Sequence, residues 1–143
     1  MANLDTFHSA WRPRVLSVLR IITGFMFIAH GTQKLFNYPQ SQGGGPTPLF
    51  SFMGFGGTLE LVGGSLILLG LFTRVTAFIL CGMMAVAYFM VRAPLGFYPL
   101  LNNGRLDALL CFVFLYFVFA GPGAWSLDAI WRSRGLAVRS EAI

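Results

Sequence analysis

Apolar residues dominate four stretches of this chain, and glycine, proline and polar residues separate the stretches from one another. The apolar stretches cover about residues 15–36, 49–72, 75–91 and 106–120. The first has 22 residues, enough at about 1.5 Å per residue to cross a hydrocarbon core of about 30 Å. The pattern predicts an all-α fold: a transmembrane four-helix bundle that forms one membrane domain over residues 1–143.

The segments between the apolar stretches predict two loops and one tight turn. Gln40–Pro48 holds three glycines and two prolines, and Arg92–Asn103 holds two prolines and one glycine. Thr73-Arg74 leaves room only for a short turn, which predicts an antiparallel hairpin of the second and third helices. Pro13 stands where a helix usually begins, so residues 1–13 are expected at the membrane interface, ahead of the first helix.

The C-terminal part predicts a helix that lies on the membrane and does not cross it. Gly121-Pro122-Gly123 ends the fourth apolar stretch sharply. Trp125–Trp131 then has the pattern of a short amphipathic helix at the interface, with Ser126 as its N-cap.

Composition and charge agree with a membrane protein. The chain is 56% hydrophobic and 10% charged, whereas about 25% of the residues of soluble domains are charged. Its net charge of +5 does not indicate nucleic-acid binding, because the basic residues do not form one stripe. The termini and the 73–74 turn carry Arg12, Arg14, Arg74, Arg132, Arg134 and Arg139, and the opposite side carries Lys34, Arg92 and Arg105. Lys and Arg accumulate on the cytoplasmic side, so both termini are predicted in the cytoplasm of a multi-pass protein of a bacterial-type inner membrane.

Ionisable residues inside the apolar stretches are the candidates for function. A charged group at the centre of a bilayer costs roughly 2.5–3.5 kcal/mol on insertion scales, so such residues usually face the protein interior and pair with one another. Counted from the cytoplasmic ends of their helices, His30 lies roughly 22 Å deep, Glu60 about 18 Å and Asp107 about 20 Å. The sequence therefore predicts that three residues from different helices reach one layer.

Helical spacing indicates which helices meet at this layer. His30 and Lys34 are four residues apart and share one face of the first helix. Gly56, Glu60 and Gly64 are likewise spaced by four, which places the carboxylate on a smooth strip where another helix can pack closely. We therefore expect the first two helices to pack together, with Glu60 near His30 or Lys34.

Two kinds of role follow for these residues. His30 and Glu60 are the candidate catalytic residues, which would exchange protons with a substrate. Lys34, Arg105 and Asp107 are the candidate substrate-binding residues, with the two cations holding negative charge. Two simpler readings stay open. Glu60 with Lys34 or His30 would be an ion pair that only sets the helix register, and Asp107 would be favoured at a helix start by the helix dipole.

The remaining polar residues have structural explanations. Arg20 is expected to extend to the interface or to cap the surface helix through Asp128, and Arg74 is expected to mark topology. Cys81 and Cys111 are interpreted as small apolar fillers, because their depths of about 9 Å and 14 Å on antiparallel helices make a disulfide doubtful. No metal site is predicted from the spacing of cysteines and other ligands.

Several short motifs in order resemble the DoxX family of small four-helix membrane proteins. The resemblance covers roughly residues 16–128. It rests on His30-Gly31-x-x-Lys34, Glu60-x-x-Gly63-Gly64, Gly70-x-x-Thr73-Arg74, Asn103-Gly104 and Gly121-x-Gly123 followed by Leu127-Asp128. The family is named after a subunit of a thiosulfate:quinone oxidoreductase, and related members are associated with thiol and oxidative-stress redox complexes. The resemblance implies a quinone-linked redox subunit with His30, Lys34 and Glu60 near its site.

Three functions follow as hypotheses. The first is a subunit of a quinone-linked oxidoreductase with an outer-leaflet pocket for a quinone head group or a small anion. The chain has no haem, iron–sulfur or dinucleotide motif, so no intrinsic cofactor is expected beyond a bound quinone. The second is a non-catalytic accessory subunit packed against a larger membrane complex, and the third is an oligomeric small-solute carrier. The expected partners are membrane lipid and other membrane subunits or further copies of this chain.

Overall fold

The protein is α-helical throughout its regular structure. A computed structural model describes residues 2–40 and 45–140, with side chains described within residues 6–40 and 45–133. The helices are α1 (Ala2–Phe36), α2 (Phe52–Leu69), α3 (Thr73–Ala87), α4 (Arg105–Ala120) and α5 (Leu127–Ser140). A π-helical turn, η1 (Tyr88–Arg92), and a 3₁₀ turn, η2 (Ala93–Leu95), extend α3. The described residues contain no strand, which confirms the predicted all-α class.

Three helical segments are long and apolar enough to cross a membrane. They are Thr6–Phe36, Phe52–Leu69 and Thr73–Leu95, as found within the described residues. The fourth predicted span, α4, is a helix of 16 residues, or about 24 Å at 1.5 Å per residue. These segments make the chain a membrane protein by length and composition.

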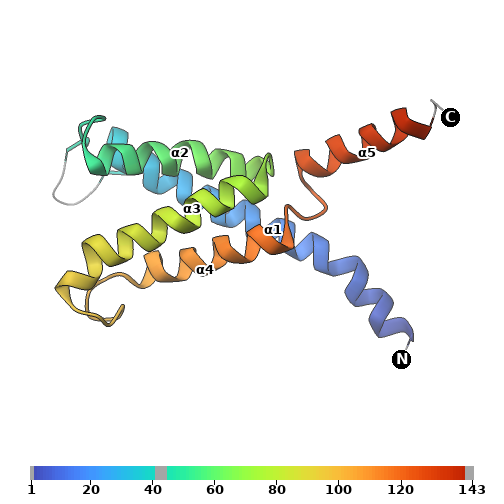
Figure 1. The fold of residues 1–143 in the computed structure, drawn as a ribbon, viewed down its shortest axis with the longest axis horizontal. Coiled ribbons are helices and arrows are strands. Elements are labelled where there is room, and N and C mark those ends of the chain that lie inside the picture. Colours follow the sequence, from blue (N-terminus) through green and yellow to red (C-terminus); the bar gives the residue numbers. More distant parts are fainter. Residues whose placement is uncertain (1, 41–44, 141–143) are drawn as a thin grey trace.

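One hydrophobic core joins the first four helices. Figure 1 shows α1 beside α2 and α3 beside α4, with both termini at the same end of the molecule. The ring of Phe27 from α1 packs edge-on against Phe114 from α4, with 4.9 Å between the ring centroids. The other buried members of this core are Ile67, Ala77, Leu80, Met84, Leu110 and Phe117. Side chains from α1, α2, α3 and α4 are therefore packed in one interior.

Glycines bring α1 and α2 into backbone contact. A Cβ atom added at Gly24 would lie 2.6 Å from the backbone nitrogen of Leu68, and one added at Gly31 would lie 2.6 Å from that of Leu61. On α2, a Cβ atom added at Gly64 would lie 2.9 Å from the backbone nitrogen of Ile28 on α1, whereas one at Gly56 would meet nothing within 4 Å. The predicted close packing of the first two helices is confirmed, but Gly56 is not part of it.

Replacing Gly31 by alanine is expected to destabilise the protein by about 1–3 kcal/mol, because the new methyl group would meet backbone that cannot move aside. Gly82→Ala on α3 is the matched control. A Cβ there has nothing within 4 Å, and alanine also has the better helix propensity, so no loss is expected. Unfolding in mixed detergent micelles with increasing dodecyl sulfate measures both variants. Equal stability of the two would contradict the close α1–α2 packing.

Two helices are longer than predicted. The expected start of the first helix near Val15 is wrong, since α1 begins at Ala2 and contains Pro13 within it. A proline removes one backbone donor, and in a helix of 35 residues the loss of one hydrogen bond does not end the helix. The C-terminal helix also extends past the predicted Trp131 to Ser140, because no proline follows to stop it.

Local hydrogen bonds decide where the other helices begin. Ser51 is the N-cap of α2, with its Oγ accepting from the backbone N–H of Gly54 at 3.0 Å, so α2 starts three residues later than predicted. Asp128 accepts from the backbone N–H groups of Phe72 and Thr73, both at 2.9 Å, so α3 starts two residues earlier. The predicted cap of the last helix is confirmed, because the N–H of Ala129 donates to Ser126 Oγ at 3.1 Å.

Arg20 is buried at the end of the molecule that carries both termini. Its side chain is 0% exposed, so the expectation that it extends to the interface is wrong. Nε donates to the carbonyl oxygen of Pro122 at 2.8 Å, and the other guanidinium nitrogens donate to carbonyls at the end of α2 and ahead of α5. These acceptors are Ile67, Leu68 and Trp125. The last carbonyls of a helix lack partners within it, and a guanidinium with five donors satisfies several of them at once.

The two cysteines meet between α3 and α4. The Sγ atoms of Cys81 and Cys111 lie 3.7 Å apart, and both thiols are free. The expectation that their depths keep them apart is wrong. Counting residues from approximate helix ends carries an error of several ångströms, which is as large as the depth difference it produced.

Candidate functional site

An apolar cavity lies between α2 and α3, towards the end of the molecule opposite the termini. Its volume is about 430 Å³. Figure 1 shows the α3–α4 pair diverging from the α1–α2 pair towards this end. The apolar walls are formed by Phe52, Met53, Phe55, Gly56, Leu59, Ile79, Met83, Met84, Val86, Ala87 and Val91, and the charged lining residues are Lys34, Glu60, Arg92 and Asp107. Four charged side chains therefore border a cavity that is otherwise apolar.

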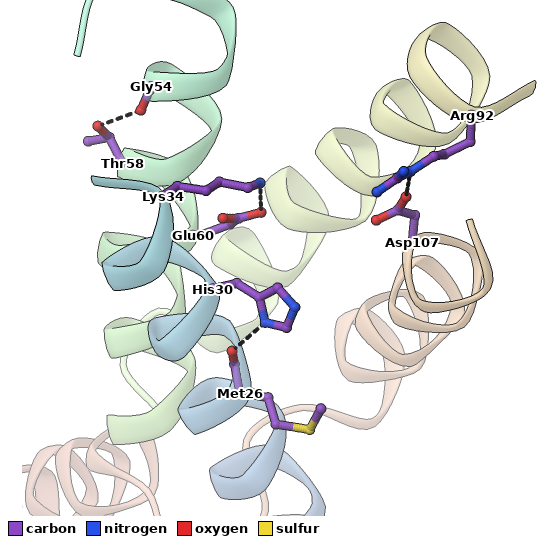
Figure 2. A network of polar contacts seen from close by, with 8 residues as sticks. All are labelled: Met26, His30, Lys34, Gly54, Thr58, Glu60, Arg92 and Asp107. Carbon is purple, nitrogen blue, oxygen red and sulfur yellow. Dashed lines mark hydrogen bonds and ion pairs between the residues drawn. The ribbon is translucent and has the colours of Figure 1, made fainter. Parts of the chain in front are cut away.

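Lys34 and Glu60 form an ion pair at one side of the cavity. Lys34 lies in the last turn of α1, where the helix dipole favours a cation, and Nζ is 2.6 Å from Glu60 Oε1 on α2. The Glu60 side chain is only 4% exposed, and that of Lys34 is 30% exposed. This pair confirms the predicted contact between the first and second helices, and Figure 2 shows it.

The second carboxylate oxygen of Glu60 is unpaired. Oε2 is buried and has no hydrogen-bond partner among the residues that the structure describes. Buried polar atoms are nearly always hydrogen-bonded, so an exception calls for a physical explanation. Because Glu60 lines the cavity, a molecule in the cavity is a candidate partner for this oxygen.

Arg92 and Asp107 form a second ion pair on the same cavity. Arg92 Nε lies 2.9 Å from Asp107 Oδ2, with the side chains 38% and 19% exposed. Figure 2 shows the two pairs at a similar height in the molecule, one from α1 and α2 and the other from η1 and α4. From the sequence, Asp107 was a predicted site residue, whereas Arg92 was not. The available signal was that both residues flank the loop between two antiparallel helices, which brings them opposite one another.

His30 lies one turn from Lys34 on α1 but does not line the cavity. Its ring is half-buried, and Nδ1 is hydrogen-bonded to the carbonyl oxygen of Met26 at 2.8 Å. The structure therefore brings Lys34, Glu60 and Asp107 to one cavity and places His30 beside it.

The other predicted residues lie elsewhere. Arg105 begins α4, is exposed, and is not among the residues that line the cavity. Arg74 donates to the carbonyl oxygen of Val118 at 2.7 Å and so caps the end of α4. Asp128 caps α3, and Arg20 joins α2 to the segment before α5, both at the end of the molecule that carries the termini. Within the described residues, no group of three or more His, Cys, Asp or Glu side chains is arranged to hold a metal ion.

The fold and the cavity define a helical membrane protein with an apolar cavity that four charged side chains border. The family model named DoxX matches residues 15–93, more than half of the chain. The chain therefore belongs to the DoxX family. This match includes α2, α3, Lys34 and Glu60, and it ends just after Arg92.

Three relatives are similar to this chain over most of its length. An uncharacterized protein of Haemophilus influenzae is 46% identical over 132 residues, covering 90% of this chain and 96% of its own length. An uncharacterized membrane protein of Mycobacterium tuberculosis is 31% identical, covering 91% of this chain and 88% of its own length. A Bacillus subtilis protein with the name "Putative oxidoreductase CatD" is 30% identical, with coverage of 78% and 82%. No solved structure matches the chain.

Proposed function

We propose that this protein is the membrane subunit of a quinone-linked redox system and that its cavity binds the quinone head group. The observation that carries the proposal is the unpaired, buried Oε2 of Glu60 at the wall of an apolar cavity. A hydroquinone hydroxyl would donate a hydrogen bond to this oxygen and so remove the cost of leaving it unpaired. A purely apolar ligand such as an acyl chain would leave it unsatisfied.

The size and walls of the cavity fit such a ligand. Small-molecule sites usually measure about 300–1,000 Å³ and are mostly apolar with a few polar groups, and this cavity of about 430 Å³ has that composition. Several wall residues are also exposed at the molecular surface, among them Phe52, Phe55 and Ile79 at 59%, 63% and 50%. In a membrane that surface faces lipid, so a lipid-soluble molecule would reach the cavity directly from the bilayer.

The residues at the cavity supply the chemistry that a quinone needs from its protein. A quinone takes up two electrons and two protons when it is reduced to a hydroquinone. Through Oε2, Glu60 is placed to pass protons to a quinone oxygen during reduction and then to accept a hydrogen bond from the hydroquinone hydroxyl, while Lys34 stays paired to Oε1. Lys34 is a cation that would stabilise negative charge on a ligand at this side of the cavity. The Arg92–Asp107 pair would provide a second polar contact for the ligand. We assign to His30, one turn from Lys34 on α1, the role of exchanging protons with Glu60 from beside the cavity.

We place the protein in a bacterial-type inner membrane as a four-helix transmembrane bundle. Helix α4 packs along α3 and shares the core, which supports its crossing the membrane with the other three. Both termini lie at one end of the molecule. Arg12 and Arg14 belong to the N-terminal part of α1, Arg74 to the first turn of α3 and Arg132 to α5. Because basic residues accumulate on the cytoplasmic side, this end would face the cytoplasm.

The proposal requires a partner to supply electrons. The sequence contains no haem, iron–sulfur or dinucleotide motif, so the reducing equivalents would come from another protein of the complex. The name of the Bacillus subtilis relative, which gives it as an oxidoreductase, supports a redox role. The large apolar surface of the helices offers area for contact with such a membrane subunit.

Binding of a quinol probe tests the proposal. Purified protein in detergent micelles is titrated with decylubiquinol and with decylubiquinone, and binding is followed by isothermal titration calorimetry. Glu60→Gln should weaken quinol binding by roughly 10–100-fold, the value of a hydrogen bond to a charged group. The loss should be smaller for the quinone, which has no hydroxyl to donate.

Arg105→Gln is the control for this experiment. Arg105 carries a charge near the same end of the bundle but lies outside the cavity lining, so quinol binding should be unchanged. The proposal fails if the wild-type protein binds neither probe, or if Glu60→Gln binds the quinol as tightly as the wild type does.

A further inference from the structure

A pair of cysteine thiols lies between α3 and α4, separate from the cavity, and is a second place where the protein could carry out chemistry. Cys81 and Cys111 are 30 residues apart in sequence, yet their Sγ atoms lie 3.7 Å apart. Cys111 Sγ also donates to the carbonyl oxygen of Cys81 at 3.5 Å. Both side chains are half-buried beside the apolar core, and neither lines the cavity. These are the two cysteines of the whole sequence.

The geometry is close to that of a disulfide. The S–S bond length is about 2.05 Å, so the two sulfur atoms need to approach by less than 2 Å. Rotation about the Cα–Cβ bonds moves sulfur atoms by this amount without moving the helices. The side chains also point towards one another, since each sulfur is within hydrogen-bond range of the other. The two thiols are therefore close enough for oxidation to join α3 and α4.

The surroundings determine which oxidant can react. An apolar environment disfavours the thiolate, so a single cysteine at this place would react slowly, and a polar oxidant would rarely reach it. A second thiol within contact distance changes the outcome, because it reacts with the sulfenic acid that forms first and converts it to a disulfide. A pair of this kind is suited to an oxidant that dissolves in lipid.

We propose that Cys81 and Cys111 form a reversible intramolecular disulfide on reaction with lipid-soluble hydroperoxides. One sulfur takes the terminal oxygen of the hydroperoxide as the O–O bond breaks, which yields a cysteine sulfenic acid and an alcohol. The other sulfur then displaces water from the sulfenic acid as the S–S bond forms. Two electrons pass from the two thiols to the peroxide, and a dithiol reductant restores both thiols.

The disulfide would connect two helices that both contribute to the cavity. Helix α3 supplies Met83 and Met84 to the cavity wall, and α4 supplies Asp107. A covalent link at Cys81 and Cys111 holds these two helices at a fixed separation, and so restrains one wall of the cavity. The oxidation itself does not depend on a ligand in the cavity, so it can be tested separately from the proposed function.

The test uses the full chain reconstituted in lipid nanodiscs. The protein is treated with cumene hydroperoxide, alkylated with N-ethylmaleimide and digested with trypsin without reduction. Cleavage after Arg74, Arg92, Arg105 and Arg132 separates the two cysteines into peptides 75–92 and 106–132. We expect mass spectrometry to find these two peptides joined by a disulfide, in protein that migrates as a monomer. Dithiothreitol should restore two alkylated thiols.

A shifted-cysteine variant is the matched control. Cys111→Ala combined with Phe112→Cys keeps two thiols but moves one to a side-chain position that is 68% exposed. Its disulfide should form roughly tenfold or more slowly, because the high effective concentration of the facing thiols is lost. Cys81→Ala should instead hold a sulfenic acid at Cys111, detected as a dimedone adduct.

Three results would overturn the proposal. The first is that both thiols of the wild-type protein stay open to alkylation after cumene hydroperoxide treatment. The second is a disulfide that joins only two copies of peptide 75–92 or two copies of peptide 106–132, which would indicate linkage between chains. The third is a shifted-cysteine variant that forms its disulfide as fast as the wild type.

Discussion

Arg20→Met should lower the free energy of unfolding by about 3–5 kcal/mol. The substitution removes the buried guanidinium and its N–H donors, and so leaves several carbonyl acceptors unpaired. The guanidinium donates to carbonyls of Ile67, Leu68, Pro122 and Trp125. It thus joins α1, the end of α2 and the segment before α5 in one contact. Methionine retains the apolar length of the side chain, so the loss reports the hydrogen bonds.

The place of the damage distinguishes this role from general instability. Hydrogen exchange in Arg20→Met should rise most in residues 121–130, where the N–H of Ala124 bonds to Pro13 and that of Asp128 bonds to Gly70. Arg20→Lys should give an intermediate loss, because an ammonium cannot reach carbonyls on both sides at once. Arg14→Met is the control. Arg14 is exposed, and its cation–π contact with Trp11 is at 5.5 Å, so its loss should stay below about 1 kcal/mol. Equal losses for Arg20→Met and Arg14→Met would contradict this account.

Lys34→Met should cost about 3–5 kcal/mol of stability, because it leaves the buried Glu60 carboxylate without its cation. Glu60 is 4% exposed and its Oε2 is already unpaired within the described part of the chain. Arg92→Met is the comparison at the second ion pair. Its side chains are 38% and 19% exposed, so the loss should be about 1 kcal/mol or less. Unfolding in mixed micelles measures the stability of both variants. Equal losses would show that burial does not determine how much each ion pair contributes to the free energy of unfolding.

The double variant Lys34→Met with Glu60→Met separates a structural pair from a functional one. Replacing both partners by apolar side chains of similar size is often neutral or stabilising, so most of the lost stability should return. Quinol binding should not return, because Oε2 is gone. If the double variant is stable and binds decylubiquinol like the wild type, the ion pair only sets the helix register. That result would refute the proposed function.

Much of the site followed from sequence because helical spacing and the cost of burying charge are local properties. The spacing of His30 and Lys34, together with the apolar setting of Glu60, was enough to predict a contact between the first two helices. The position of Arg105 at the start of α4 was also predictable, within one residue. Whether its side chain points to the cavity was not, because that depends on the rotation of α4 about its own axis. The same rotation places Asp107 on the cavity and opposite Arg92.

The start of α1 and the burial of Arg20 could not be predicted from local sequence patterns. Pro13 has the same local signature at a helix start and within a long helix, so the pattern could not distinguish the two. Arg20 near a membrane surface usually extends to water, but here carbonyls from residues 67–68 and 122–125 surround its guanidinium. Those acceptors are far away along the chain, and the sequence around Arg20 does not predict contacts with them.

The amino-acid order alone was sufficient for the helical membrane class, the approximate helices and the family, because each depends on short-range periodicity and on the transfer of side chains into lipid. The helix rotations that join Glu60 to Lys34, Arg92 to Asp107 and Cys81 to Cys111 depend on how four helices share one core. That sharing is set by close packing across the interior, including the glycine contacts between α1 and α2. Packing of this kind joins residues that are distant in sequence, so only the folded arrangement revealed which polar groups are partners and that Glu60 Oε2 has none within the described residues.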